Sequence, residues 1–345
     1  MKYDALLLLS FGGPEKPDEV MPFLENVLRG RNVPPERMEE VSKHYYEFGG
    51  KSPINDQNRA LIDALSTELA SHEIDLPIYW GNRNWHPLLT DTMENMVQDG
   101  VKRALVFVTS IFSSYSGCRQ YREDILKSQA EIGEHAPELL KIRSFYNHPG
   151  FIETMRSSVR DAVAEIPAER HATTQLIFTA HSIPNAMADT CDYVQQLNES
   201  CSLVASDFPD LNWQLVYQSR SGPPSQPWLE PDVCDTIEQL GKAKQVTDVV
   251  VIPIGFISDH MEVLFDLDTE AKQVATDVGI NLVRAATASI HPQFISMIRE
   301  LIQERLSENP ERPSLGQFGP SHDTCPEGCC AYSPGRPGTH RPTAS

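Results

Sequence analysis

The chain has 345 residues, of which 48 are Asp or Glu and 29 are Lys or Arg, so its formal net charge is −19. This charge argues against nucleic acid as the main partner and against a polybasic membrane patch, because both need clustered cations. Hydrophobic residues make up 40% of the chain and charged residues 22%, which is typical of a soluble globular protein with about two domains of roughly 150 residues each.

Neither a membrane span nor a secretory signal is visible near the N-terminus. The apolar run 5–9 is far shorter than the roughly 20 residues of a membrane helix, and no cleavage-site pattern follows it. We therefore expect a cytoplasmic protein without integral membrane association. The seven cysteines are an odd number in a long chain, which argues against a disulfide framework in a reducing compartment.

Apolar runs alternate with helix-periodic segments throughout the chain. The predicted strands are 5–11, 76–81, 103–110, 140–146, 175–181, 213–219, 248–256 and 281–286. The predicted helices are 18–29, 35–48, 56–72, 89–99, 119–132, 150–165, 189–206, 231–240, 260–278 and 292–307. Several strands are continuous apolar runs, as in a parallel sheet covered on both faces. The alternation predicts an α/β fold with two doubly wound parallel sheets that face one cleft.

The pattern divides into three parts. We expect an N-terminal α/β domain over 1–150, a C-terminal α/β domain over 151–306 and a tail over 307–345. Seven of the 26 prolines lie in this tail, whose composition is that of a linker. In doubly wound folds, ligands bind beyond the carboxyl ends of the strands, so the residues that follow each strand are the candidates for a site.

The first strand leads into Phe11-Gly12-Gly13. These glycines alone indicate a tight turn. The spacing of a dinucleotide-binding loop is absent there, and no phosphate-binding loop occurs elsewhere, so the sequence argues against a nucleotide cofactor.

His181 ends another predicted strand and is followed by Ser182. A neutral imidazole at that position can accept a proton or bind a metal ion. A structural histidine is the alternative, and Ser182 lacks the surroundings of a nucleophilic serine.

An acidic stripe follows the strand 248–256. Asp259, Glu262, Asp266 and Glu270 are spaced by three, four and four residues, which places them on one face of a helix. A solvated helix face is the simplest interpretation. Because like charges repel at this spacing, a positive group would relieve them, and a divalent cation suits carboxylate and imidazole ligands.

Two further segments could carry chemistry. Trp228 lies in a loop rich in proline and glycine, where it would form the wall of an aromatic ligand site or simply pack into a rigid turn. Cys325, Cys329 and Cys330 lie close together in the tail. Three thiolates suit zinc or an iron–sulfur centre, but both need a fourth ligand. His322 is near in the sequence; a redox-labile tail and an accidental cluster are the alternatives.

Seven motifs in a fixed order resemble the ferrochelatases, which insert ferrous iron into a porphyrin during haem biosynthesis. They are LLLLSFGGPE (6–15), FGGKSPIN (48–55), GNRNWHP (81–87), SSYSGCRQYRED (113–124), TAHSIP (179–184), QSRSGPP with PWLEPD (218–232), and PIGFISDHMEVLFDLD (253–268). The resemblance runs over residues 3–305 and is strongest to actinobacterial coproporphyrin III ferrochelatases. It implies a lyase with a chelatase-type fold.

The resemblance also implies roles for individual residues. His181 corresponds to the metal-binding and proton-accepting histidine of the family, and Glu262 to its carboxylate partner. His260 and Asp259 correspond to supporting residues of the same motif. Asp266 and Glu270 fall on the acidic path for metal or protons.

Porphyrin contacts are implied at a larger set of positions. These are Phe11, Arg29, His44, Tyr45, Ser52, Tyr121 and Trp228. Tyr121 matches only after a shift of one residue. Phe11 stands where some coproporphyrin-type enzymes carry an iron-ligating tyrosine, and a phenylalanine cannot ligate iron.

The segment 30–47 is short and charged, where membrane-associated ferrochelatases carry a long apolar insertion. Together with Arg29, this favours coproporphyrin III over protoporphyrin IX as the substrate that receives Fe²⁺. A protoporphyrin IX ferrochelatase, a sirohydrochlorin chelatase and a non-catalytic haem- or metal-binding protein are the alternatives. Other enzymes of the haem pathway are the partners that the resemblance suggests.

Some ferrochelatases hold a 2Fe–2S cluster through three cysteines after the last helix and one internal cysteine. Cys325, Cys329 and Cys330 match that location, and Cys118 resembles the internal ligand. The C-x3-C-C spacing differs from the well-known cases. The resemblance thus predicts a 2Fe–2S cluster as cofactor, with these four cysteines as ligands.

Overall fold

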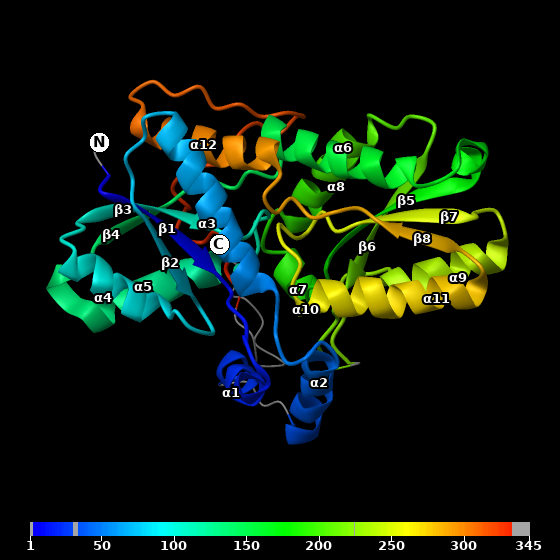
Figure 1. Ribbon diagram of the computed structural model, residues 1–345, viewed down its shortest axis with the longest axis horizontal. Helices are drawn as coiled ribbons and strands as arrows, with labels where there is room; N and C mark the ends of the chain where they lie inside the picture. Colours follow the sequence, from blue (N-terminus) through cyan, green and yellow to red (C-terminus); the bar gives the residue numbers. More distant parts are fainter. Residues whose placement is uncertain (1–2, 30–33, 224, 333–345) are drawn as a thin grey trace, which may run out of the picture.

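Two parallel β-sheets of four strands each form the centre of the molecule (Figure 1). The computed structural model describes residues 3–29, 34–223 and 225–332. The N-terminal sheet has the order β2-β1-β3-β4, with β1 at Ala5–Ser10, β2 at Ile78–Asn82, β3 at Arg103–Val108 and β4 at Glu138–Lys141. The C-terminal sheet has the order β6-β5-β7-β8, with β5 at Thr174–His181, β6 at Asn212–Gln218, β7 at Asp248–Ile252 and β8 at Asn281–Arg284. The two sheets therefore repeat one topology, and the predicted α/β fold is confirmed.

Helices cover both faces of the sheets, so the central strands are mostly apolar, with the buried polar residues Ser10 and Asp248 at strand ends. Every residue of β1 and of β7 is buried, as expected for a doubly covered parallel sheet. The α-helices of the N-terminal half are α1 (Pro17–Val27), α2 (Pro35–Glu47), α3 (Ile54–Ser71), α4 (Leu89–Gln98) and α5 (Gln120–Ile132). Those of the C-terminal half are α6 (Pro149–Ala164), α7 (Asn185–Ala188), α8 (Tyr193–Ala205), α9 (Val233–Ala243), α10 (Met261–Val263), α11 (Lys272–Val278) and α12 (Pro292–Leu306).

Several predicted elements differ from the observed ones, and the predicted strand 140–146 is found earlier in the chain, as β4 at Glu138–Lys141. The predicted helix 260–278 consists of α10, a π-helix at Leu264–Ala271 (η4) and α11. The predicted helix 189–206 is divided into α7 and α8. The predicted strand 248–256 ends at Ile252, because Pro253 has no N–H to continue the ladder. Apolar runs do not reveal where a ladder stops, which explains the last difference.

A single cluster of buried side chains joins the two sheets. It includes Leu8 and Phe107 of the N-terminal sheet, Phe178 and Ile252 of the C-terminal sheet, and Phe294 of α12. Helix α12 packs against α3 and against α6, and Figure 1 shows it lying across the top of the molecule. The last helix therefore ties the halves together, and the predicted boundary near residue 150 stays a prediction.

The predicted tail packs against the body as far as the structure describes it. The Leu315 N–H donates to the Asn147 carbonyl at 2.8 Å, and the Gln317 N–H donates to Glu199 Oε1 at 2.7 Å. The last 13 residues, 333–345, lie outside the described part of the chain. Among the helices that the structure describes, none combines the length and the apolar character that crossing a bilayer requires.

We expect the buried Arg143–Glu304 pair to stabilise the packing of α12 and the C-terminal segment against the rest of the protein. The two side chains are 1% and 5% exposed and meet through two hydrogen bonds of 2.8 Å. Arg143→Met should lower the free energy of unfolding by about 3–5 kcal/mol, because it leaves the buried carboxylate with only the looser contact to Arg312, at 3.8 Å. Urea denaturation measures this change.

The exposed pair Arg37–Glu40, whose side chains are 48% and 58% exposed, provides the control. Arg37→Met should leave the free energy of unfolding nearly unchanged, because water screens an exposed ion pair. Equal changes in the free energy of unfolding for the two substitutions would show that the Arg143–Glu304 pair stabilises the protein no more than an exposed pair does.

Candidate active site

The strand order places the ends of β5 and β7 at the switch point of the C-terminal sheet. These two strands are neighbours, and the chain leaves them toward opposite edges, to β6 and β8. Ligands in such sheets bind outside the carboxyl ends at this point. Strand β5 ends at His181, and the segment after β7 leads to α10, which carries Glu262. Two residues that are 81 positions apart in the sequence therefore meet.

The main chain around His181 is fixed by two side chains. Tyr193 Oη donates to the His181 carbonyl at 3.0 Å, and Ser182 Oγ donates to the Leu229 carbonyl at 2.8 Å. The imidazole Nδ1 forms a short hydrogen bond with the Ser182 carbonyl. Because a carbonyl only accepts, Nδ1 must carry the hydrogen, which leaves Nε2 with a free lone pair when the ring is neutral.

That free nitrogen faces a carboxylate. His181 Nε2 lies 3.5 Å from Glu262 Oε2, and the two side chains are 33% and 53% exposed. A neutral imidazole nitrogen and a carboxylate oxygen both accept, so their contact is favourable only with a proton or a cation between them. Two ligands at roughly 2.0–2.2 Å from a tetrahedral metal lie roughly 3.4 Å apart. The spacing of the pair therefore suits a shared divalent cation. The structure brings the two residues together, and their role in binding a metal stays a prediction.

His260 precedes α10 as its N-cap residue, two positions before Glu262. Its ring meets Phe256 edge-on, with 5.0 Å between ring centroids. Burial lowers the pKa of His260, and Glu262 opposes this shift. A neutral second imidazole therefore stands beside Glu262.

Asp259 is already paired with a cation that the sequence reasoning missed. Arg284, at the end of β8, donates from Nη1 to Asp259 Oδ1 at 3.0 Å and from Nε to Asp268 Oδ1 at 2.6 Å. At this end of the stripe, the positive group that the sequence calls for is an arginine, and a metal ion on the rest of the stripe stays a prediction. The signal was available, since Arg284 also lies at the carboxyl end of a predicted strand.

The remaining acidic row of Glu262, Asp266 and Glu270 begins in α10 and continues along the π-helix η4. Asp266 Oδ2 accepts hydrogen bonds from Gln218 Nε2 at 3.3 Å and from Ser219 Oγ. Burial raises the pKa of Asp266 to about 7, and the two neighbouring carboxylates act in the same direction while the hydrogen bonds oppose them. Burial also raises the pKa of Glu270. Asp266 can therefore hold and release a proton near neutral pH.

Helix α2 of the N-terminal half covers this row. The His44 ring stacks on Phe265 with 3.6 Å between centroids and an angle of 10° between the planes. Tyr45 meets Phe23 edge-on at 5.9 Å, and burial followed by the charge of Glu262 raises the pKa of Tyr45. Phe11 is 38% exposed and meets the same Phe23 at 6.3 Å. Three predicted porphyrin contacts thus gather near the acidic row.

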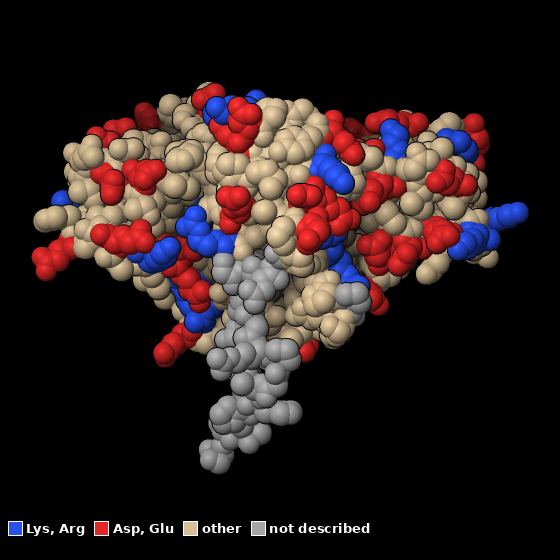
Figure 2. Space-filling model, turned by 90° about the horizontal axis from the view of Figure 1, so that it is seen from below, with Lys and Arg blue, Asp and Glu red and all other residues tan. Residues whose placement is uncertain are grey.

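The other predicted porphyrin contacts lie elsewhere or are occupied. Ser52 is 3% exposed and Tyr121 is 4% exposed, the latter beneath the Arg83 guanidinium at 4.5 Å. Both side chains are buried in the structure, and their contact with a porphyrin stays a prediction. Trp228 packs on Gly222, where a Cβ atom would lie 2.2 Å from the indole nitrogen, as the packed-turn interpretation predicts. Arg29 is exposed just after α1, and on the face that carries α1 and α2 basic side chains lie scattered among acidic ones (Figure 2).

The four cysteines predicted to bind a cluster meet in a second group, away from His181. Cys118 lies in a short π-helix at Tyr115–Arg119 (η1) and hydrogen-bonds with Cys325 and Cys330, which hold the pKa of its thiol far below the usual range. Lys141 Nζ, which the sequence reasoning missed, lies 2.8 Å from Cys118 Sγ and acts in the same direction.

The adjacent cysteines of this group are also close enough to share a metal. Cys329 Sγ and Cys330 Sγ lie 3.7 Å apart, helped by a left-handed φ of 52° at Cys330. Two thiolates at roughly 2.3 Å from one tetrahedral metal lie roughly 3.8 Å apart. Arg119 Nη1 holds the turn by donating to the carbonyls of Glu327 and Cys329 at 3.0 and 3.1 Å. The donor set therefore fits an iron–sulfur group.

We predict that Asp266 makes the stability of the protein depend on pH. Its carboxyl group has a pKa near 3.8 when unperturbed and about 7 in the folded chain, so folding takes up a proton between these values and the stability falls as the pH rises from about 4 to about 7. Asp266→Asn should remove this fall. Thermal unfolding of both proteins across that range measures it, and parallel pH profiles would contradict the assignment.

Comparison with known proteins identifies relatives over nearly the whole chain. The family model described as Ferrochelatase matches residues 3–306. The chain is 59% identical to the Ferrochelatase of Rhodopirellula baltica over 97% of this chain and 95% of that protein. It is 50% identical to the Coproporphyrin III ferrochelatase of Streptomyces coelicolor, again over 97% of this chain and 95% of that protein.

The solved structures support the fold. SirB from Bacillus subtilis with Fe³⁺ superimposes with a TM-score of 0.56 at 11% identity, over 89% of this chain and 98% of that one. This likeness confirms the predicted chelatase-type arrangement of two sheets. The family model and the full-length relatives together show that the protein belongs to the ferrochelatase family.

Proposed function

We propose that this ferrochelatase inserts Fe²⁺ into coproporphyrin III to give Fe-coproporphyrin III. The observation that carries the proposal is the facing pair of His181 Nε2 and Glu262 Oε2, 3.5 Å apart at the switch point of the sheet. The relative from Streptomyces coelicolor is named for coproporphyrin III, which supports this substrate. The more similar relative from Rhodopirellula baltica is named only as a ferrochelatase.

Insertion of a metal into a porphyrin must remove two pyrrole protons and strip water from the cation. In our proposal, His181 Nε2 accepts a proton from the porphyrin, since its other nitrogen is committed to the Ser182 carbonyl and a positioned imidazole is the commonest general base in enzymes. Glu262 holds the incoming Fe²⁺, whose charge suits a carboxylate. His260, at the N-cap of the helix that carries Glu262, would help to position that carboxylate.

The acidic row provides a route between this pair and solvent. Asp266, with a pKa of about 7, can take a proton from the site and release it again at the pH of the cell. Glu270 follows one turn further along. Asp259 is bound to Arg284, so we assign it to holding the segment in place rather than to the route.

The macrocycle would lie against the aromatic groups of α1 and α2. His44, Tyr45 and Phe11 provide flat or apolar surface there, and Arg29 at the end of α1 provides an exposed cation for a propionate. Coproporphyrin III has four carboxylates and protoporphyrin IX has two, so such a cation should strengthen the binding of coproporphyrin III more. Protoporphyrin IX remains the alternative substrate. Action in the cytoplasm beside other haem-pathway enzymes stays a prediction.

We further propose that the cysteine group holds a 2Fe–2S cluster. Cys118, Cys325, Cys329 and Cys330 would be its ligands, because their sulfur atoms converge from η1 and from the C-terminal segment. A bound cluster would supply one-electron redox chemistry and would cross-link these two segments. Lys141 stabilises the thiolate of Cys118 before any metal is bound.

His181→Ala and Glu262→Gln should each lower kcat for Fe²⁺ insertion by about 10²-fold or more, the usual contribution of a positioned acid–base group. Anaerobic assays that follow the absorbance of coproporphyrin III measure this. His72→Ala, at the exposed C-cap position that follows α3, should leave kcat unchanged. Near-full activity of His181→Ala would overturn the proposed role.

The choice of porphyrin can be measured directly. We expect kcat/KM to be higher for coproporphyrin III than for protoporphyrin IX in detergent. Arg29→Ala should narrow that preference by about tenfold, as expected from about 1.4 kcal/mol for one lost ionic hydrogen bond. A higher kcat/KM for protoporphyrin IX with the unaltered protein would contradict the substrate proposal.

A further inference from the structure

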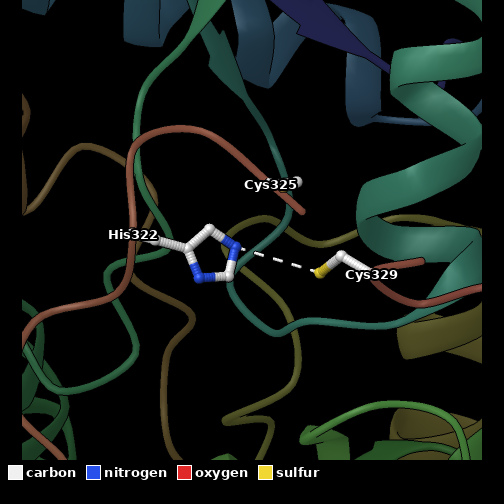
Figure 3. Close-up of side chains that lie close together, drawn as sticks. All are labelled: His322, Cys325 and Cys329. Atoms are coloured by element: carbon white, nitrogen blue, oxygen red, sulfur yellow. Dashed lines mark hydrogen bonds between the residues drawn. The ribbon is translucent and has the colours of Figure 1, made fainter. Parts of the chain in front are cut away.

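The cysteine group contains a fifth donor besides its four cysteines. Figure 3 shows the His322 ring turned toward Cys329, with Cys325 close by. His322 Nε2 lies 3.9 Å from Cys329 Sγ. The ligand atoms of His322, Cys325 and Cys329 all lie within 4.8 Å of one another. A cluster with two irons takes four protein ligands, so the described residues offer one donor more than it needs.

The contacts of the five donors differ. Cys118 interacts with Cys325 and Cys330, and Cys330 is only 3% exposed. Cys329 contacts the exposed His322, and both have their ligand atoms within 4.8 Å of Cys325. The imidazole therefore lies where it can reach a metal held by Cys325 in place of Cys329.

We propose that His322 is an alternative ligand for the position of Cys329, so that the site can hold its metal group with three sulfurs and one imidazole nitrogen. This inference rests on the proposed 2Fe–2S cluster. Neutral imidazole is a known replacement for thiolate on an iron of such clusters, as in Rieske centres. When Cys329 is absent, an iron–nitrogen bond replaces the iron–sulfur bond and the number of ligands stays the same.

Substitution of the two adjacent cysteines tests the proposal. The chain is prepared anaerobically as Cys329→Ala, Cys330→Ala and the double variant Cys329→Ala/His322→Ala, and iron, acid-labile sulfide and visible absorbance are measured. Cys329→Ala should keep about two irons per chain. Cys330→Ala should lose them, because His322 is not grouped with Cys330. The double variant should lose them as well, which shows that retention depends on the imidazole.

Pulsed electron paramagnetic resonance of the reduced cluster then identifies the ligand. Cys329→Ala should show a strong nitrogen coupling that changes on labelling histidine with ¹⁵N, and the unaltered protein should lack it. Loss of iron from Cys329→Ala to the level of Cys330→Ala, or retention without this coupling, would overturn the role of His322. Absence of iron and sulfide from the unaltered protein would overturn the cluster itself, so the two failures are distinguishable.

Discussion

The pairing of β5 with β7 is the constraint on which the site depends. Register between these strands is parallel from Thr174–Asp248 to Phe178–Ile252, and it brings the end of β5 beside the segment that leads to Glu262. The strands are buried on both faces, so a slip in register would displace a whole set of apolar side chains. The core thereby holds His181 and Glu262 at a separation that a mobile loop could not maintain.

The carboxylates around that pair have different local environments, although the chain as a whole is strongly acidic. Arg284 neutralises the two carboxylates nearest β8, Asp259 and Asp268. Asp266 is instead enclosed by Gln218, Ser219 and its acidic neighbours, and its pKa rises to about 7. Residues of one stripe therefore have different roles, because one end faces a cation and the other is buried among acceptors and donors.

The sequence predicted the layers and the central pair well but not the partners of that pair. All eight predicted strands were found, because continuous apolar runs identify buried parallel strands, and His181 was recognised because it ends one of them. The π-helix η4 could not be predicted, since its apolar period is close to that of an α-helix. Long-range contacts were also missed, such as Lys141 with Cys118 and Tyr193 with His181, because they depend on how distant segments pack. Ser52 and Tyr121 show that a family motif does not tell which side chains are exposed.

The proposed insertion of Fe²⁺ depends on one metal position between His181 and Glu262. Anomalous diffraction from a crystal soaked with Co²⁺, a stand-in for Fe²⁺, tests it most directly. We predict a cobalt peak within bonding distance of His181 Nε2 and of a Glu262 carboxylate oxygen. Full occupancy elsewhere on the acidic row, with no peak at His181, would contradict the account.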